Sequence, residues 1–309
     1  MAGNKCKLCP IGCVDVSVCM GFDANKHMFV RRYRNFRVMH LSIEEFGLYH
    51  FYPANSVILA VTSGCNMLCS FCPMHSTVFS FSEGIEEKEI LLTIINAAER
   101  LGSNIVAFYC NSLLDLDLIR SIKTQFDYQI IAMTNGFISK EILKCYLSHL
   151  DAVLLRLFGF SDTTYSRITP ILGATQHIQR FIYEAASKDK HLEIEFYVIP
   201  GITRDDEFLS LVSFLHKVNP NIPLHIRRFR PCFVELDRRP TQTEEILHYY
   251  NLAKKFLHYV YAELWISPYN DTFCPNGHLV IQRFGWKIRK IKIKEGKCPI
   301  CGEEIPIKM

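Results

Sequence analysis

The chain has 309 residues, of which 49% are hydrophobic and 21% charged, and its formal net charge is +4 at pH 7. These values are ordinary for a globular protein and exclude a disordered or fibrous chain. No apolar run approaches the roughly 18 residues of a membrane span, and the lysines and cysteines of the first segment argue against a secretory signal. We therefore expect a cytoplasmic protein with no membrane partner.

Most of the thirteen cysteines lie in tight clusters, which favours metal ligation over disulfides in a chain long enough to bury a large core. The first cluster predicts a cysteine-rich head over residues 1–50. Its four thiols follow a CxxCxxxCxxxxxC pattern and belong to Cys6, Cys9, Cys13 and Cys19. The spacing leaves two hypotheses open, a 4Fe-4S cluster or a zinc ion.

Residues 51–268 predict an α/β barrel, because apolar segments of strand length alternate there with helical patterns. Six strands are expected, over 57–62, 105–110, 129–134, 152–158, 193–199 and 223–229. Helices are expected between them, including one over 87–101 and one over 244–261. Right-handed crossovers would curl the parallel strands into a partial (β/α)6 barrel, with reactive groups after the strand ends.

A CxxxCxxC array follows the first of these strands directly and consists of Cys65, Cys69 and Cys72. Three thiolates this close together can hold a 4Fe-4S cluster and leave its fourth iron without a protein ligand. Such an array is typical of radical S-adenosylmethionine (SAM) enzymes, in which the open iron binds SAM and the cluster cleaves it to a 5′-deoxyadenosyl radical. The alternatives are three buried structural cysteines, or part of a zinc site with a distant fourth ligand.

Residues 269–309 predict a zinc ribbon, because two metal-binding knuckles flank a strand-like segment. The expected ligands form a closed Cys3His set of Cys274, His278, Cys298 and Cys301. Basic residues crowd the segment 287–294 between the knuckles. They indicate either a solvated strand edge or a nucleic-acid surface.

Several stretches together resemble one known family. They are IEEFGLYHFYP (43–53), GCNMLCSFC (64–72), TNGF (134–137), VIPGI (198–202), PLHIRRFRP (223–231) and TFCPNGHLVIQRFGW (272–286). The likeness is to the radical SAM protein of the AmmeMemoRadiSam system, which is related to the pyruvate formate-lyase (glycyl radical enzyme) activating enzymes. It covers nearly the whole chain, including the cysteine-rich head. The resemblance implies an enzyme that abstracts hydrogen from a protein or small-molecule substrate and draws electrons from a donor such as ferredoxin or flavodoxin.

The resemblance also implies side chains that contact SAM. Phe71 stands where an aromatic ring covers the adenine, Thr134 and Asn135 end the third predicted strand, and His225 lies on the sixth.

Two of the family's motifs are altered in this chain. Asn111 and Ser112 replace an acidic motif after the second strand, and Arg156 stands where an acid is expected on the fourth. An uncharged side chain binds an ammonium group more weakly than a carboxylate does. Two further hypotheses therefore stay open: an iron-sulfur scaffold that has lost SAM chemistry and, from the basic residues, an RNA-modifying radical SAM enzyme.

Overall fold

One sheet organises the molecule. The computed structural model describes residues 7–12, 35–79, 85–109, 115–188, 190–264 and 266–309. Within these ranges, eight strands follow one another across the sheet in sequence order. They are β1 (Phe36–Ser42), β2 (Ser56–Thr62), β3 (Ile105–Phe108), β4 (Gln129–Thr134), β5 (Ala152–Leu157), β6 (His191–Val198), β7 (Leu224–Arg228) and β8 (Val260–Ala262). All six predicted strands are confirmed, as β2 to β7.

Strands β2 to β8 run parallel, and β1 pairs antiparallel with β2 in a register that places Phe36 opposite Thr62. Residues from Phe36 to 50, which the sequence assigned to the head, therefore belong to the barrel sheet and its lining. The reason is that β1 satisfies its backbone groups on β2, as an edge strand of a mixed sheet commonly does.

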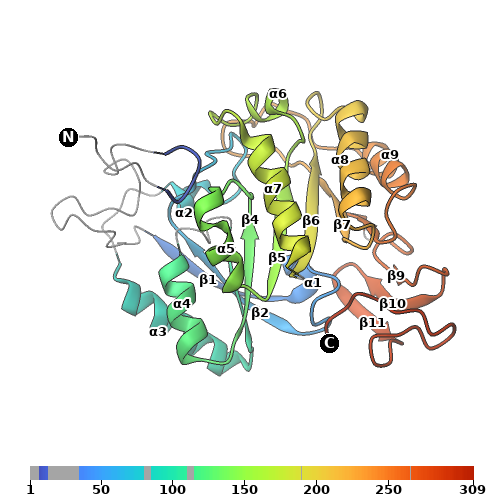
Figure 1. Ribbon diagram of the computed structural model, residues 1–309, viewed down its shortest axis with the longest axis horizontal. Helices are drawn as coiled ribbons and strands as arrows, with labels where there is room; N and C mark the ends of the chain where they lie inside the picture. Colours follow the sequence, from blue (N-terminus) through green and yellow to red (C-terminus); the bar gives the residue numbers. More distant parts are fainter. Residues whose placement is uncertain (1–6, 13–34, 80–84, 110–114, 189, 265) are drawn as a thin grey trace.

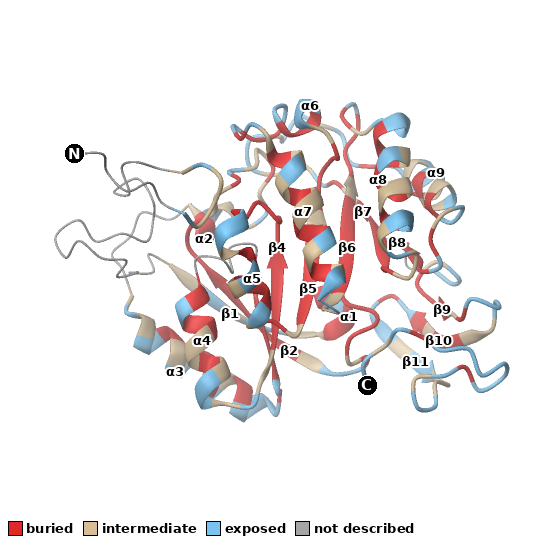
Figure 2. Cartoon of the chain, in the orientation of Figure 1, coloured by how far each residue is buried: buried red, intermediate tan, exposed pale blue. Residues whose placement is uncertain are grey.

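Helices cover the outer face of the sheet, as Figure 1 shows. The longer ones are α3 (Glu87–Leu101), α4 (Leu116–Gln125), α5 (Lys140–Ser148), α7 (Ala174–Ser187), α8 (Asp205–Val218) and α9 (Thr243–Ala253). Short helices are α1 (Ile43–Phe46), α2 (His75–Val78) and α6 (Asp162–Tyr165). In α3, buried Ile90, Ile94 and Ala98 recur every four residues and face the sheet, which confirms the predicted helix over 87–101. Figure 2 shows the same division, with buried strands inside and exposed outer helix faces.

The helix predicted over 244–261 was wrong in its second half. Helix α9 ends at Ala253, and the amide of Leu257 closes the last turn on the Ala253 carbonyl at 3.0 Å. The chain then enters β8, where Val260 pairs with Leu224 of β7. Three buried residues are too few to show the alternation that identifies a strand from sequence.

The inner face of the sheet is apolar on one half and polar or charged on the other. On β2 to β5 it carries apolar residues such as Leu59, Ala107, Met133 and Leu154, which pack against α1 and the segment that follows it. On β6 and β7 the corresponding positions are charged or polar and belong to Glu193, Glu195, His225 and Arg227. Both halves are buried, so every one of those charges needs a partner inside the barrel.

A second sheet of three strands follows the barrel, in the order β11-β10-β9. Its strands are β9 (Thr272–Phe273), β10 (Leu279–Phe284) and β11 (Lys287–Ile291). The chain end returns to the barrel, where the Lys308 amide donates to the His50 carbonyl at 2.9 Å and the Tyr52 amide to the Lys308 carbonyl at 2.8 Å. This C-terminal module lies where the barrel strands begin (Figure 1). Among the described helices, none combines the length and the apolar character that a membrane span requires.

Candidate functional site

Cys65, Cys69 and Cys72 line a single cavity of about 380 Å³. The cavity lies at the carboxyl ends of the strands, because much of its remaining wall comes from residues at or just beyond the ends of β3, β4, β5, β6 and β7. This is the edge at which parallel α/β barrels place their reactive groups. The structure thus brings the three predicted cluster ligands together.

The cysteine loop leaves β2 through a turn that glycine makes accessible. Gly64 has φ of 95°, a conformation that other residues rarely adopt, and its amide donates to the Val78 carbonyl at 2.6 Å. Leu68 also lies in the left-handed region, with φ of 52°. The loop therefore follows a tightly curved path instead of an extended one, and its three cysteines face the same cavity.

Two asparagines hold the loop against the end of β4. The Asn135 amide nitrogen donates to the Asn66 oxygen at 2.9 Å, and the Asn66 amide nitrogen donates to the Phe137 carbonyl at 2.8 Å. The Phe137 amide in turn donates to the Asn135 side chain at 2.9 Å. Asn135 was predicted to contact SAM, and it does line the cavity. Its bonds to the loop, which sequence reasoning missed, make it a positioning residue for Cys65.

The cysteine thiols lie in an apolar setting. Burial raises the pKa of Cys65, and it raises the pKa of Cys72 to about 11. Thiolates are the form that binds metals, and burial disfavours their charge. A bound cationic cluster is the partner that would make three thiolates favourable in this cavity.

Aromatic side chains form much of the cavity wall. Phe71 is buried and packs edge-on against Phe158 and Phe229, with ring centroids 5.0 and 5.4 Å away. Tyr109 and Tyr197 line the same cavity. The wall can exclude water and offer ring faces or edges to a flat ligand.

Arg156 also lines the cavity, and its guanidinium is already engaged. Its Nε donates to Glu195 at 2.8 Å, and its Nη1 donates to the Tyr109 hydroxyl at 2.8 Å. Arg227 binds the same carboxylate at 2.7 Å. Burial alone would raise the pKa of Glu195, but Arg227 and Arg156 hold it below its ordinary value, so this glutamate stays charged and fixes Arg156.

His225 does not line the cavity. It lies at the start of β7, where its Nε2 contacts the Glu193 carboxylate at 2.7 Å and its ring stacks on Tyr261 at 5.1 Å. This position does not support the predicted contact with SAM, because β7 brings only its far end to the cavity. Thr134 is likewise buried, and its hydroxyl accepts the Gly136 amide at 3.2 Å. Asn111 and Ser112 lie outside the described residues.

Glu193 is the centre of a polar network near the start of the strands. Its carboxylate accepts the amides of Tyr49 and His50 at 3.0 and 2.8 Å, and His191 contacts it at 2.9 Å. Burial opposes ionisation, yet the hydrogen bonds from His191 and His225 hold the pKa of Glu193 well below its ordinary value. Burial lowers the pKa of His225, which favours its neutral form as the donor to Glu193.

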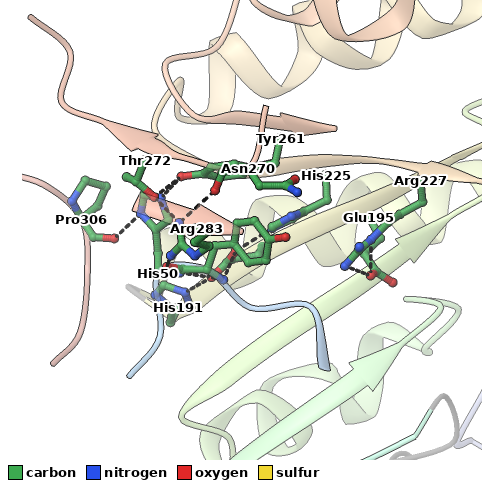
Figure 3. Close-up of polar contacts among 12 residues, drawn as sticks. His50, His191, Glu195, His225, Arg227, Tyr261, Asn270, Thr272, Arg283 and Pro306 are labelled. Atoms are coloured by element: carbon green, nitrogen blue, oxygen red, sulfur yellow. Dashed lines mark hydrogen bonds and ion pairs between the residues drawn. The ribbon is translucent and has the colours of Figure 1, made fainter. Parts of the chain in front are cut away.

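The C-terminal module joins this network through Arg283 (Figure 3). This side chain is only 2% exposed. Its guanidinium donates to the carbonyls of Tyr49 and Asn270 at 2.9 and 3.1 Å and to the Thr272 hydroxyl at 2.8 Å. His50 completes the junction, since its Nδ1 donates to the Pro306 carbonyl at 3.1 Å. An arginine from β10 thus fastens the module to the segment that lines the barrel.

The predicted C-terminal ligands come together in the structure. One ligand atom from each of Cys274, His278, Cys298 and Cys301 lies within 4.8 Å of all the others. The Cys274 and Cys301 sulfurs are 3.8 Å apart, and His278 Nδ1 is 3.4 Å from the Cys274 sulfur. Zinc-sulfur bonds of about 2.3 Å in a tetrahedron place two sulfurs about 3.8 Å apart. The four donor atoms therefore have a spacing that suits a single metal ion.

The cysteines of the loop after β2 are arranged differently from that site. Among the described residues, the C-terminal set is the one group of three or more His, Cys, Asp or Glu side chains that converges as a site for one metal ion, and Cys65, Cys69 and Cys72 share a cavity without doing so. Three thiols that share a cavity without converging on a point fit a multinuclear cluster better than a single ion.

Of the predicted head ligands, Cys9 alone is described, whereas Cys6, Cys13 and Cys19 lie outside the described residues. Cys9 packs against the barrel core, and the neighbouring Leu8 carbonyl accepts the Ser139 amide at 3.2 Å. The segment 7–12 is thereby attached at the start of α5. On the basic segment, Lys287, Arg289 and Lys290 of β11 are exposed.

Comparisons with known proteins give the following results. No family model matches the chain. The uncharacterized protein MJ0808 of Methanocaldococcus jannaschii is 26% identical over 329 residues, which cover 98% of this chain and 95% of that protein. The structure of Streptococcus suis SuiB bound to the precursor peptide SuiA matches 69% of this chain and 48% of the SuiB chain, with 12% identity and a TM-score of 0.50. The radical SAM methyltransferase TsrM of Kitasatospora setae, solved with cobalamin and a [4Fe-4S] cluster, matches 58% of this chain and 35% of its own, with 13% identity and a TM-score of 0.45.

The likeness to SuiB confirms the predicted fold class, an α/β fold built on a parallel sheet. The chain spans about half the length of the SuiB chain. At 12% identity this likeness concerns the fold alone.

Proposed function

We propose that this protein is a radical SAM enzyme whose Cys65, Cys69 and Cys72 hold a 4Fe-4S cluster. The observation that carries the proposal is that these three thiols, spaced CxxxCxxC, line one cavity at the carboxyl edge of a parallel sheet. The resemblance to the AmmeMemoRadiSam radical SAM protein and to the activating enzymes supports it from the sequence side.

The donor set fits such a cluster. Thiolates are the usual protein ligands of iron-sulfur clusters, and three of them leave one of four irons open. The three thiols line one cavity without forming a site for a single ion, which agrees with this. When bound, the cluster supplies the electron that cleaves SAM to methionine and a 5′-deoxyadenosyl radical, which takes hydrogen from a substrate.

The protein's own residues have separate tasks in this proposal. Asn135 keeps the cysteine loop on β4, Phe71 and its aromatic neighbours exclude water, and Arg156 presents a positive charge fixed by Glu195. A fixed guanidinium suits the SAM carboxylate. Asn111 and Ser112 stay proposed contacts for the SAM ammonium group. Asn111 and Ser112 are uncharged where the family has an acidic motif, and Arg156 is basic where the family has an acid. Both changes agree with a site that binds SAM without a carboxylate at these positions.

For the substrate we propose a protein or peptide. The SuiB structure contains a precursor peptide, which is a property of that protein. In this chain, the loops around the cavity expose large apolar side chains: Leu68 is 48% exposed, Val234 68% and Leu236 67%. Exposed apolar groups at a site rim favour a macromolecular partner. We further propose an electron donor such as ferredoxin or flavodoxin.

For the C-terminal site we propose structural zinc. Three thiols and one imidazole close around a point with no open position, which is typical of structural rather than catalytic zinc. For the four head cysteines we propose a second 4Fe-4S cluster, with zinc as the alternative.

Anaerobic reconstitution with iron and sulfide, followed by dithionite and SAM, tests the central proposal. We expect release of 5′-deoxyadenosine from the wild type and none from the Cys69→Ala variant. Cys145→Ala is the matched control, because its thiol lies on α5 outside the cavity and accepts a bond from Arg120 at 2.8 Å. Full cluster content without any 5′-deoxyadenosine would instead support the iron-sulfur scaffold.

A further inference from the structure

A fourth cysteine faces the cluster cavity. Cys232 follows β7 and lines the same space as Cys65, Cys69 and Cys72. Its thiol donates to the Phe71 carbonyl at 2.9 Å. Phe71 immediately precedes Cys72, so this sulfur touches the backbone of the cluster loop itself. Four sulfurs from two segments more than 150 residues apart therefore border one cavity.

The segment that carries Cys232 is joined to the cluster loop by further bonds. The Val234 amide donates to the Ser70 carbonyl at 2.9 Å, and the Ser70 hydroxyl donates to the Glu235 carboxylate at 2.9 Å. Together with the Cys232 thiol, these bonds run along consecutive residues of the loop. The sulfur is therefore held at a fixed place beside the cysteines of the array.

The backbone next to Cys232 adopts an unusual conformation. Phe233 has φ of 57°, which is uncommon for an aromatic residue, and its ring stacks on His75 at 4.7 Å with an interplanar angle of 17°. A left-handed aromatic residue costs free energy that surrounding contacts must offset. This turn directs the side chain before it, Cys232, toward the cavity and the side chain of Phe233 toward α2.

We propose that Cys232 is a displaceable fourth ligand of the cluster, bound to the open iron when SAM is absent and released when SAM arrives. The inference rests on the proposed function, because it needs a cluster held by the other three cysteines. On ligation the Cys232 S–H bond breaks, its proton passes to solvent, and a sulfur-iron bond forms with no change in oxidation state. The hydrogen bond to the Phe71 carbonyl is given up in that state and returns when the thiol is released.

This ligand would act as a competitor of SAM. If the open form is only about one tenth of the population, the apparent dissociation constant for SAM is about tenfold above its intrinsic value. Capping the iron would also protect it, since an iron without a protein ligand is the one most easily lost or attacked. Cys232 would thus keep the resting cluster intact until cosubstrate is present.

Cys232→Ser tests the proposal, because serine keeps a donor for the Phe71 carbonyl but is a poor ligand for iron. Cys232→Ala is the second variant, and Cys145→Ala is the control. The probe is cyanide, which binds an open iron, and the readout is the electron paramagnetic resonance spectrum of the reduced cluster without SAM. We expect the wild type and the control to need about tenfold more cyanide than both Cys232 variants for the same change of spectrum. Equilibrium dialysis should show SAM binding about tenfold tighter in both variants.

Two results separate the possible failures. If the wild type holds a cluster and cleaves SAM, but its spectrum changes with cyanide as much as the variants' spectra do, Cys232 is not a ligand and this inference alone fails. If the wild type assembles no 4Fe-4S cluster on Cys65, Cys69 and Cys72, the proposed function fails as well.

Discussion

Arg283→Met should detach the C-terminal module from the barrel. The substitution removes the two bonds to the carbonyls of Tyr49 and Asn270 and the bond to the Thr272 hydroxyl, and it removes a cation held 4.4 Å from the centre of the Tyr49 ring. Methionine retains much of the volume, so the change tests polar contacts rather than a cavity.

The magnitude follows from the acceptors left behind. A buried acceptor that loses its donor costs about 1–3 kcal/mol, and two backbone carbonyls are affected. Against this, Arg283 Nε has no hydrogen-bond partner among the described residues, so removing the buried charge recovers part of its desolvation cost. We therefore expect a loss of about 3 kcal/mol of unfolding free energy.

Denaturant unfolding of the metal-loaded protein measures this loss, and hydrogen exchange locates it. The amides of Tyr49 and His50, which Glu193 accepts, should exchange faster in Arg283→Met. Arg239→Met is the control, because its guanidinium is exposed and pairs with Glu245 at the surface. A variant with unchanged exchange at these amides and a loss below about 1 kcal/mol would refute the view that Arg283 fastens the module.

Three further predictions concern the metal module, acid stability and the cluster loop. Cys298→Ala should release the C-terminal metal and lower the melting temperature, as measured by metal analysis and calorimetry, whereas Cys145→Ala should do neither. The pKa of Glu193 in the folded state is well below 4.5, so its contribution to folding stability is present above about pH 4.5 and is lost as the pH falls through the folded-state pKa. Glu193→Gln should therefore be less stable at neutral pH and lose less stability on acidification. Equal losses of unfolding free energy with falling pH in both proteins would count against this. Asn135→Ala should weaken the attachment of the cysteine loop by about 1–2 kcal/mol and speed iron loss to a chelator, with the exposed Asn96→Ala on α3 as control. Equal iron retention in Asn135→Ala and the wild type would contradict the role of Asn135.

The barrel was predictable from sequence because its parallel strands are buried on both faces. Such strands read as short continuous apolar runs, and the six runs became β2 to β7. The cysteine sets were predictable for a similar reason, since ligand spacing within a loop or knuckle is local information. By contrast, β1 (Phe36–Ser42) and β8 (Val260–Ala262) lie at the sheet edges, where a mixed or very short sequence pattern does not identify a strand.

The contacts of individual side chains were less predictable. His225 was placed correctly on a strand, but its second position in β7 puts it near the beginning of the strand, away from the cavity. Arg283 lies in β10, whose sequence does not indicate a buried arginine, and its partner Tyr49 is 234 residues away. Cys232 stands alone in the sequence, so cysteine spacing did not predict its place at the cluster cavity. Each of these facts depends on long-range packing that one sequence does not encode locally.

The two buried glutamates of β6 serve different regions of the barrel, one at the start of the strands and one near the cavity. Glu193 and Glu195 point to the same face because side chains alternate along a strand, and two residues advance it by about 6.6 Å. Glu193 therefore lies near the beginning of the strands, where it binds the segment that Arg283 also binds. Glu195 lies closer to the cavity, where it orients Arg156. Because their hydrogen-bond partners differ, a substitution at Glu193 perturbs closure of the barrel and one at Glu195 perturbs the cavity. The same strand thus supports the metal module at one end and the proposed SAM site at the other.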